Sequence, residues 1–189
     1  SGYPAIPHGE WLRLSAEIRR LPELRRRLRR LEGHPEPTVA AALEALPHRP
    51  PMLLLDDVEI RAEDHAVGTL LIREDHPFLD GHFPGRPIVP GAIILEAMAQ
   101  VGHVLLHHLE PLDKEREVLL LRGADRFRLR RVVRPGDELR LELRPLWKRV
   151  QLWAMEGKAF VGPHCVATAE IRAVRSTWER ALGPEEKER

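Results

Sequence analysis

The sequence predicts an α+β fold in which an antiparallel sheet wraps around one long central helix. Residues 91–109 are apolar on almost every helical face, so this helix must be covered on most of its sides. Short segments with strand character, separated by turn signals, lie on both sides of that helix in the chain. The length of 189 residues allows one main domain plus an appendage.

The N-terminal region, residues 1–37, is predicted to be a helical extension followed by a linker. Within residues 10–32 the apolar residues recur at spacings of three and four, which indicates an amphipathic helix, and Pro22 predicts a kink in it. The sequence "GHPEP" at 33–37 is typical of a linker. The reverse face of the helix is rich in arginine. The helix is expected to pack on its own domain, with this basic face in solvent. The alternative is that the basic face contacts a membrane surface or an acidic partner.

The main domain is predicted to cover residues 38–175, with a charged C-terminal tail at 176–189. It starts with a short helical segment at 38–46, and the central helix follows a loop at 80–91. The turn signals between strands include "RPGD" and "GPH". The predicted strands cover residues 52–60, 65–72, 117–131, 137–149, 151–160 and 165–174.

Composition argues against several classes of function. Lys and Arg total 30 against 29 Asp and Glu, and this balance does not favour a general polyanion binder such as a nucleic-acid-binding protein. Cys165 is the only cysteine, which excludes an intrachain disulfide framework and predicts a reducing, cytoplasmic location. We expect no membrane span, because no apolar run reaches the roughly 18 residues required, and no signal peptide.

The stretch "DGHFPGRPIVPGAIILEAMAQ", residues 80–100, places a stiff loop with one histidine directly before an apolar helix with one carboxylate. Pro90 and Gly91 begin the helix, where unpaired N–H groups and a partial positive charge suit a carbonyl oxygen that becomes negative during reaction. Gly91 also lets another molecule approach the main chain closely. The residues that limit the movement of His82 on this loop are Phe83, Pro84, Pro87 and Pro90.

Glu96 lies in an apolar part of the helix, and such surroundings favour the protonated form of a carboxyl group. Glu96 is therefore a candidate proton donor, and Gln100, one turn later on the same face, can orient it. A histidine base at His82 and a carboxylic acid at Glu96 supply both halves of an elimination. The alternative interpretation is that His82 caps the loop and Glu96 forms a buried pair with an arginine.

Five motifs occur in the order "LPHRPPMLLLD" (46–56), "GHFPGRPIVPG" (81–91), "LEAMAQ" (95–100), "GADRFRLRRVVRPGD" (123–137) and "CVATAEI" (165–171). In these motifs the sequence resembles the (3R)-hydroxyacyl-[acyl-carrier-protein] dehydratases of the FabZ type, which have the hot-dog fold. The resemblance covers about residues 42–174, and the central loop and helix are its most specific signals. Glutamate at position 96 is more similar to the dehydratase-only branch than to the FabA-type dehydratase/isomerase, which has aspartate.

The resemblance implies the dehydration of (3R)-3-hydroxyacyl thioesters on acyl carrier protein to trans-2-enoyl thioesters in fatty acid biosynthesis, without a metal or other cofactor. It implies His82 as the base for the C2 proton, Glu96 as the acid for the leaving 3-hydroxyl and the amide of Gly91 as the donor to the thioester carbonyl. It also implies a homodimer or a trimer of dimers, in which two subunits join their sheets and place His82 of one chain near Glu96 of the other. The residues expected to bind the substrate are Gly91, Phe83, Pro90 and Gln100.

The chain departs from the family pattern at three positions. The family usually has aromatic residues where this chain has Pro50 and Met52, and a small residue where it has His103. These departures leave the catalytic pair in place but bear on the acyl-chain length and the shape of the tunnel. The extension through residue 37 lies outside the usual family length.

Basic residues between positions 122 and 149 suit an acidic carrier protein. Alternation along a strand would put Arg126, Arg128 and Arg130 on one face, where they are predicted to bind the carrier. The alternative is a solvated face that has no partner.

The histidines of the central helix and the single cysteine raise two further hypotheses, a metal site and a nucleophile. His103 and His107 are one helical turn apart, with His108 beside them, and could share a zinc ion, but a third ligand is not evident. Cys165 lies in a predicted strand, where a small thiol is usually a packing residue rather than a nucleophile.

Two rival functions use the same fold. One is a non-catalytic acyl-thioester-binding protein that kept the pocket, and the presence of both His82 and Glu96 argues against it. The other is a thioesterase in which a carboxylate activates water.

Overall fold

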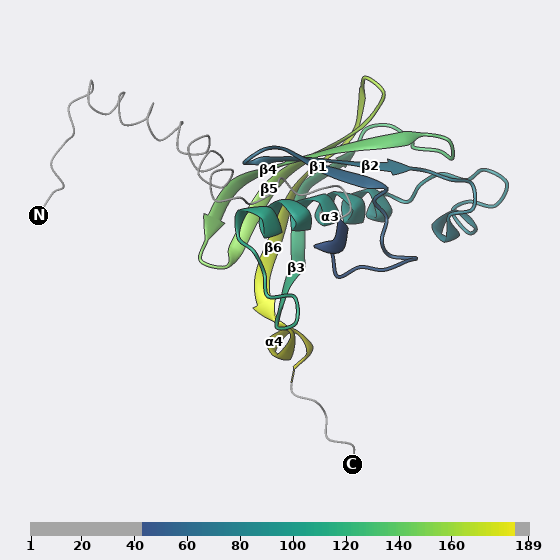
Figure 1. The fold of residues 1–189 in the computed structure, drawn as a ribbon. Helices are drawn as coiled ribbons and strands as arrows, with labels where there is room; N and C mark the ends of the chain where they lie inside the picture. Colours follow the sequence, from purple (N-terminus) through teal and green to yellow (C-terminus); the bar gives the residue numbers. More distant parts are fainter. Residues whose placement is uncertain (1–42, 184–189) are drawn as a thin grey trace, which may run out of the picture. The chain divides into compact units, whose positions relative to one another are not determined.

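The computed structural model describes residues 43–183, all within the compact unit Pro37–Arg189. Six antiparallel strands form one sheet in the order β1-β2-β4-β5-β6-β3, and these strands curve around helix α3 (Figure 1). This arrangement confirms the predicted antiparallel sheet around one long helix. The elements are β1 (Asp57–Ala62), β2 (His65–Leu71), the 3-10 helix η1 (Pro77–Leu79), α3 (Gly91–Leu109), β3 (Glu117–Leu129), β4 (Glu138–Arg149), β5 (Leu152–Val161), β6 (His164–Thr177) and α4 (Trp178–Leu182).

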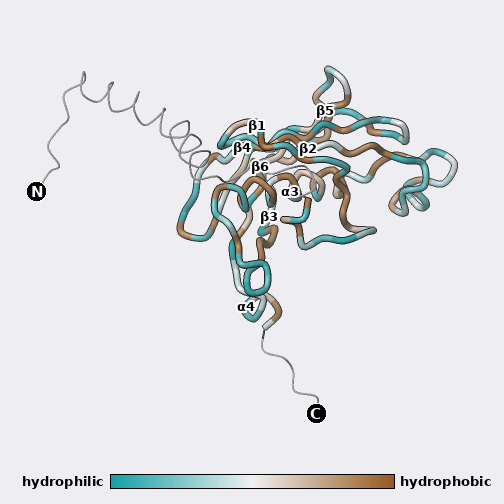
Figure 2. Tube along the Cα trace, in the orientation of Figure 1, coloured by the Kyte–Doolittle hydropathy of each residue, from teal (hydrophilic) through white to brown (hydrophobic). Residues whose placement is uncertain are grey.

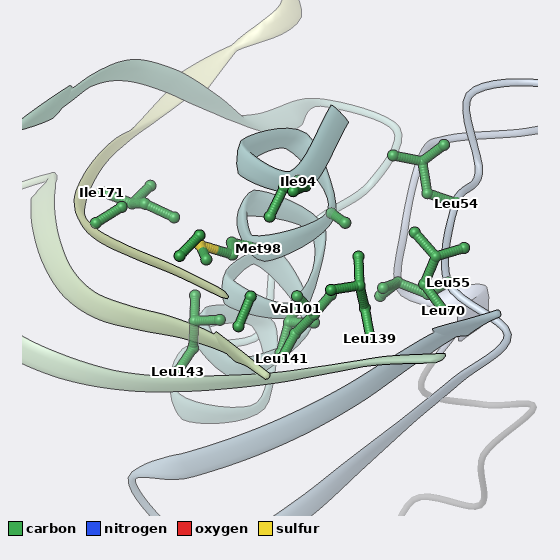
Figure 3. Close-up of a cluster of buried hydrophobic side chains, with 14 of the residues drawn as sticks. Leu54, Leu55, Leu70, Ile94, Met98, Val101, Leu139, Leu141, Leu143 and Ile171 are labelled. Atoms are coloured by element: carbon green, nitrogen blue, oxygen red, sulfur yellow. The ribbon is translucent and has the colours of Figure 1, made fainter. Parts of the chain in front are cut away.

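Helix α3 is the centre of the hydrophobic core. It contacts all six strands, and its apolar residues are buried around most of its circumference. By length and composition alone α3 is a candidate membrane span, which corrects the expectation that no apolar run is long enough, but in this domain the sheet covers it. The core side chains labelled in Figure 3 include Met98 and Val101 of α3 together with Leu139, Leu141 and Leu143 of β4.

The side chains of β4 alternate, and its apolar residues face α3. Leu139, Leu141 and Leu143 are each 0% exposed, as expected for every second residue on the inner face. On the neighbouring strand Gly68 pairs with Leu141, and a Cβ at Gly68 would lie 2.4 Å from Cγ2 of Val101. The missing side chain therefore lets α3 approach the sheet closely.

The first strand begins later in the chain than predicted. The predicted helix at 91–109 and the strand at 65–72 are confirmed as α3 and β2. Strand β1 begins at Asp57 rather than at residue 52. The reason is that the main chain at 52–54 is hydrogen-bonded to the side chain of Gln100 on α3.

The C-terminal end of the domain is longer than predicted. Strand β6 continues to Thr177, whose Oγ1 accepts a hydrogen bond of 3.2 Å from the Arg180 N–H and so caps α4. No residue of α4 is buried, and Figure 2 draws the segment around it largely in teal. The predicted helix at 10–32 lies outside the described residues, and the predicted segment at 38–46 is described only from residue 43.

Met98 and Met52 offer a matched test of the core. Met98 is 0% exposed, whereas Met52 is 49% exposed. We expect Met98→Ala to lower the free energy of unfolding by about 2 to 5 kcal/mol, because it removes buried apolar surface and leaves a cavity. Met52→Ala should change it by less than about 0.5 kcal/mol. Urea unfolding of both variants at one protein concentration measures the difference, and equal effects would contradict this description of the core.

Candidate active site

Glu96 lies in an open pocket between α3 and the sheet. The empty volume of this pocket is ≈ 390 Å³, open solvent included. The Glu96 side chain is 24% exposed, so its carboxyl group can contact neighbouring residues on one side and the pocket on the other. The residues that line the pocket are His48, Glu96, Ala99, His103, Leu119, Leu121, Met155, Ile171 and Ala173.

Gln100 fixes the orientation of the Glu96 carboxyl group. Its Nε2 donates to Oε1 of Glu96 at 2.9 Å and to the carbonyl of Met52 at 2.7 Å, and its Oε1 accepts from the N–H of Leu54 at 3.1 Å. Because a main-chain N–H can only donate, Leu54 determines which end of the amide faces Glu96. Oε1 of Glu96 is therefore an acceptor, and a proton on this carboxyl group belongs on Oε2.

The position of Gln100 bears on its expected contact with Glu96. The hydrogen bond to Glu96 confirms that the amide orients the carboxyl group. Gln100 is 0% exposed and does not line the pocket, so it lies behind the carboxyl group rather than against a bound substrate. Its contact with the substrate stays a prediction, and the contact that the structure shows is with the Glu96 carboxyl group.

His48 is a residue of this site that the sequence did not single out. Its Nε2 lies 3.4 Å from Oε1 of Glu96, and its ring meets that of His103 edge-on, with 6.3 Å between centroids. Its Nδ1 is buried and has no hydrogen-bond partner among residues 43–183. The available signal was its place in "LPHRPPMLLLD", which the sequence offered only as a family marker.

His82 lies on the loop between η1 and α3. Its Nδ1 is 3.0 Å from the carbonyl oxygen of Ile88, and the N–H of Ile88 donates back to the carbonyl of His82 at 2.9 Å. A carbonyl oxygen only accepts, so Nδ1 carries the proton and Nε2 keeps a free lone pair. The Phe83 ring stacks on the imidazole at 4.3 Å between centroids, in agreement with its expected restraint of His82. The nitrogen suited to act as a base is therefore Nε2.

One chain does not bring His82 and Glu96 into one pocket. His82 is absent from the residues that line the pocket of Glu96. The loop presents a histidine with a defined tautomer, and α3 presents a carboxyl group with a defined free oxygen. Within this chain, His82 and Glu96 therefore lie in separate places.

Gly91 begins α3 immediately after Pro90, where no side chain caps the helix. A Cβ at Gly91 would lie 2.5 Å from Cδ1 of Leu129, at the end of β3. The glycine thus has a packing role that the sequence did not indicate. Its N–H belongs to the partially positive N-terminal end of α3, as expected for a donor to a carbonyl oxygen.

A β-bulge corrects the expectation that Arg126, Arg128 and Arg130 share one face of a strand. The pairing of β3 with β6 shifts register between Asp125 and Arg128, which interrupts the alternation of side chains. Arg126 lies in this bulge with φ of 50° and forms an ion pair of 3.5 Å with Glu170. Arg128 and Arg130 are exposed, and neither side chain forms an ion pair within the described part of the chain.

Burial and hydrogen bonding account for His103 and His107 of α3. Among residues 43–183, no group of three or more His, Cys, Asp or Glu side chains is placed to hold a metal ion. Burial, with smaller contributions from nearby His48 and His107, lowers the pKa of His103 to about 4, so its imidazole is neutral near pH 7. Burial also lowers the pKa of His107, whose Nδ1 accepts a main-chain hydrogen bond of 3.1 Å. Cys165 donates to a main-chain carbonyl of its own strand at 3.5 Å.

Comparison with known proteins places this site in a family. The sequence pattern of the FabA-like domain matches residues 46–170. The chain is 43% identical over 133 residues to the 3-hydroxyacyl-[acyl-carrier-protein] dehydratase FabZ of Syntrophotalea carbinolica, covering 70% of this chain and 90% of that protein. It is 39% identical over 141 residues to the FabZ of Caulobacter vibrioides, covering 72% and 86% of the two chains.

A solved structure agrees with the fold. The dehydratase heterocomplex ApeI:P from Xenorhabdus doucetiae superposes with a TM-score of 0.61 at 22% identity, covering 75% of this chain and 94% of that chain. This likeness supports the hot-dog architecture of an antiparallel sheet around one long helix. From the matched domain and these relatives, we conclude that the chain belongs to the FabA-like family, as a 3-hydroxyacyl-[acyl-carrier-protein] dehydratase of the FabZ type.

Proposed function

We propose that this protein dehydrates (3R)-3-hydroxyacyl thioesters on acyl carrier protein to trans-2-enoyl thioesters in fatty acid biosynthesis. The observation that carries the proposal is the state of Glu96, whose Oε1 is held by Gln100 while Oε2 is left for a proton beside an open pocket. An acid that is fixed at one oxygen and available at the other suits protonation of a leaving hydroxyl.

The reaction needs one base and one acid. Nε2 of His82 removes the proton at C2, the C3–O bond breaks, and Oε2 of Glu96 gives its proton to the hydroxyl, which leaves as water. The electron pair of the C2–H bond forms the C2=C3 double bond. The N–H of Gly91 donates to the thioester carbonyl as negative charge develops there. The proton on His82 then returns through solvent to the carboxylate of Glu96, which restores both groups.

We further propose that the working site combines His82 of one subunit with Glu96 of another. In the described part of the chain, strand β3 is an edge strand of the sheet, since it pairs there only with β6. Its residues Leu119 and Leu121 line the pocket of Glu96, so a strand added at this edge would lie beside the pocket. A long unpaired edge is a template for pairing with a second chain. A homodimer joined at β3, alone or within a trimer of dimers, would therefore bring the two halves together.

The catalytic pair is tested by His82→Ala and Glu96→Gln on a (3R)-3-hydroxyacyl thioester. Each variant should lose about 100- to 10,000-fold in dehydration rate, as removal of general acid–base catalysis commonly does. Glu96→Gln should leave substrate binding nearly unchanged, because it removes a donor that acts in the transition state. Mass spectrometry of the product measures turnover to enoyl thioester.

The same assay distinguishes the rival functions, with unfolding curves as the control for folding. Release of free acid would indicate a thioesterase, and binding without turnover would indicate a non-catalytic acyl-thioester-binding protein. Dehydration by a folded His82→Ala protein at nearly the wild-type rate would contradict the assigned base.

We propose that the acidic carrier protein docks on the basic end of β3. Arg128 and Arg130 are exposed and free of ion pairs within residues 43–183, so their charges are available to a partner. The Arg126 side chain is 83% exposed and, within residues 43–183, forms an ion pair only with Glu170, so we include it as a weaker contributor. Opposite charge at such a surface chiefly accelerates association.

Reversal of charge tests the docking surface. Arg128→Glu/Arg130→Glu should reduce kcat/KM on the carrier-borne substrate, with a smaller loss at high salt, because charges are screened over about 8 Å at physiological ionic strength. Activity on an N-acetylcysteamine thioester should be unchanged. Arg61→Glu/Arg116→Glu is the control, as both residues are exposed and lie outside residues 126–130. Equal losses on the two kinds of substrate would show that Arg128 and Arg130 support the pocket instead.

A further inference from the structure

His103 lies in the same pocket as Glu96, at a deeper position. Glu96, Ala99 and His103 are separated by three and four residues along α3, so they share one helix face. The Glu96 side chain is 24% exposed, whereas His103 is 7% exposed. The pocket therefore runs from a carboxyl group near solvent toward a buried imidazole.

The pocket ends at His103 on the α3 side. No residue of α3 beyond His103 is among those that line the pocket. The sheet supplies only apolar side chains to the lining, namely Leu119, Leu121, Met155, Ile171 and Ala173. Such a lining suits a hydrocarbon chain. The polar residues of the lining are Glu96, His48 and His103, and His103 is the last residue of α3 in it.

The distance from Glu96 to His103 along α3 gives the length of acyl chain that fits between them. Seven residues of helix separate Glu96 from His103, and at a rise of 1.5 Å per residue this is about 10 Å. An extended hydrocarbon chain with bonds of 1.52 Å and angles near 111° advances about 1.25 Å per bond, so about 10 Å corresponds to roughly eight bonds. With C3 of the substrate beside Glu96, a chain along the helix reaches His103 at about carbon 11.

The imidazole limits the chain by its volume. Burial lowers the pKa of His103 to about 4, so it is uncharged near pH 7 and does not attract an acidic group at the end of the chain. His48 packs edge-on against it at 6.3 Å between centroids, which restricts the ring from one side. A neutral, packed ring therefore blocks the acyl chain sterically.

We propose that His103 is the specificity-determining residue that closes the acyl pocket and restricts efficient turnover to chains of up to about ten carbons. This inference rests on the proposed dehydratase function, because it assumes that C3 of the acyl chain lies beside Glu96. It assigns a substrate class, short- and medium-chain 3-hydroxyacyl thioesters, to the same site.

The test compares His103→Ala with His103→Leu on carrier-borne (3R)-3-hydroxyacyl substrates of 4, 8, 12 and 14 carbons. His103→Ala opens the inner end, and each additional buried methylene contributes about fourfold to affinity. We expect the ratio of kcat/KM for the 12-carbon substrate to that for the 8-carbon substrate to rise at least about tenfold in His103→Ala, since two or more methylenes gain a binding site. His103→Leu keeps a large side chain and should retain the wild-type ratio.

His107→Gln is the matched control, because His107 lies one helical turn further on and outside the pocket lining. His103→Ser provides the same opening if the alanine variant does not fold. An unchanged ratio of kcat/KM for the 12-carbon and 8-carbon substrates in His103→Ala or His103→Ser would overturn the inference, and so would an equal rise of this ratio in His103→Leu. In either case, turnover of the 8-carbon substrate would still support the proposed function. Absence of enoyl product at every chain length in the wild type would overturn both.

Discussion

The hydrogen bond from Gln100 Nε2 to Glu96 Oε1 is the interaction on which the site depends. It exists because Gln100 is locked from the opposite side by the N–H of Leu54 and the carbonyl of Met52, two main-chain groups that precede β1. The same three hydrogen bonds hold residues 52–54 against α3 and satisfy a completely buried amide in the core. The packing of this segment and the orientation of the Glu96 carboxyl group thus share one network. A proton on the carboxyl group is directed to Oε2, next to the pocket, by the way the chain packs onto its central helix.

Local patterns in the sequence predicted most of the fold, because the central helix and the strands that cover it have clear periodicities. Helix 91–109 and the strand at 65–72 follow from apolar patterning and turn chemistry. What local patterns could not supply are features set by long-range contacts. Strand β1 starts late because the preceding main chain is bonded to α3, and the bulge after Asp125 changes the faces of the arginines that follow it. His48 meets Glu96 only after the chain folds back over α3, so no spacing in the sequence reveals it.

The sequence nominated His82 and Glu96 as the base and the acid, but only the structure shows how each side chain is held. His82 and Glu96 are residue types suited to elimination, and their order around a helix N-terminus was enough to nominate them. The atoms that act are defined by neighbours: the Ile88 carbonyl fixes the tautomer of His82, and Gln100 fixes the free oxygen of Glu96. His82 does not line the pocket that Glu96 occupies, while an unpaired β3 edge borders that pocket. The two halves of the site are each preorganised, and a second subunit is the component that would join them.

Mixing two inactive proteins tests this joining of half-sites most directly. His82→Ala retains an intact Glu96 half, and Glu96→Gln retains an intact His82 half. When subunits exchange, a mixed dimer contains one site with both wild-type residues and one site with neither. We expect dehydration of a 3-hydroxyacyl thioester to reappear on mixing, at up to about a quarter of the wild-type rate for random pairing of equal amounts into dimers. No recovery of activity, with exchange demonstrated by mass spectrometry of the intact assembly, would contradict the shared site and place the base and the acid within one chain.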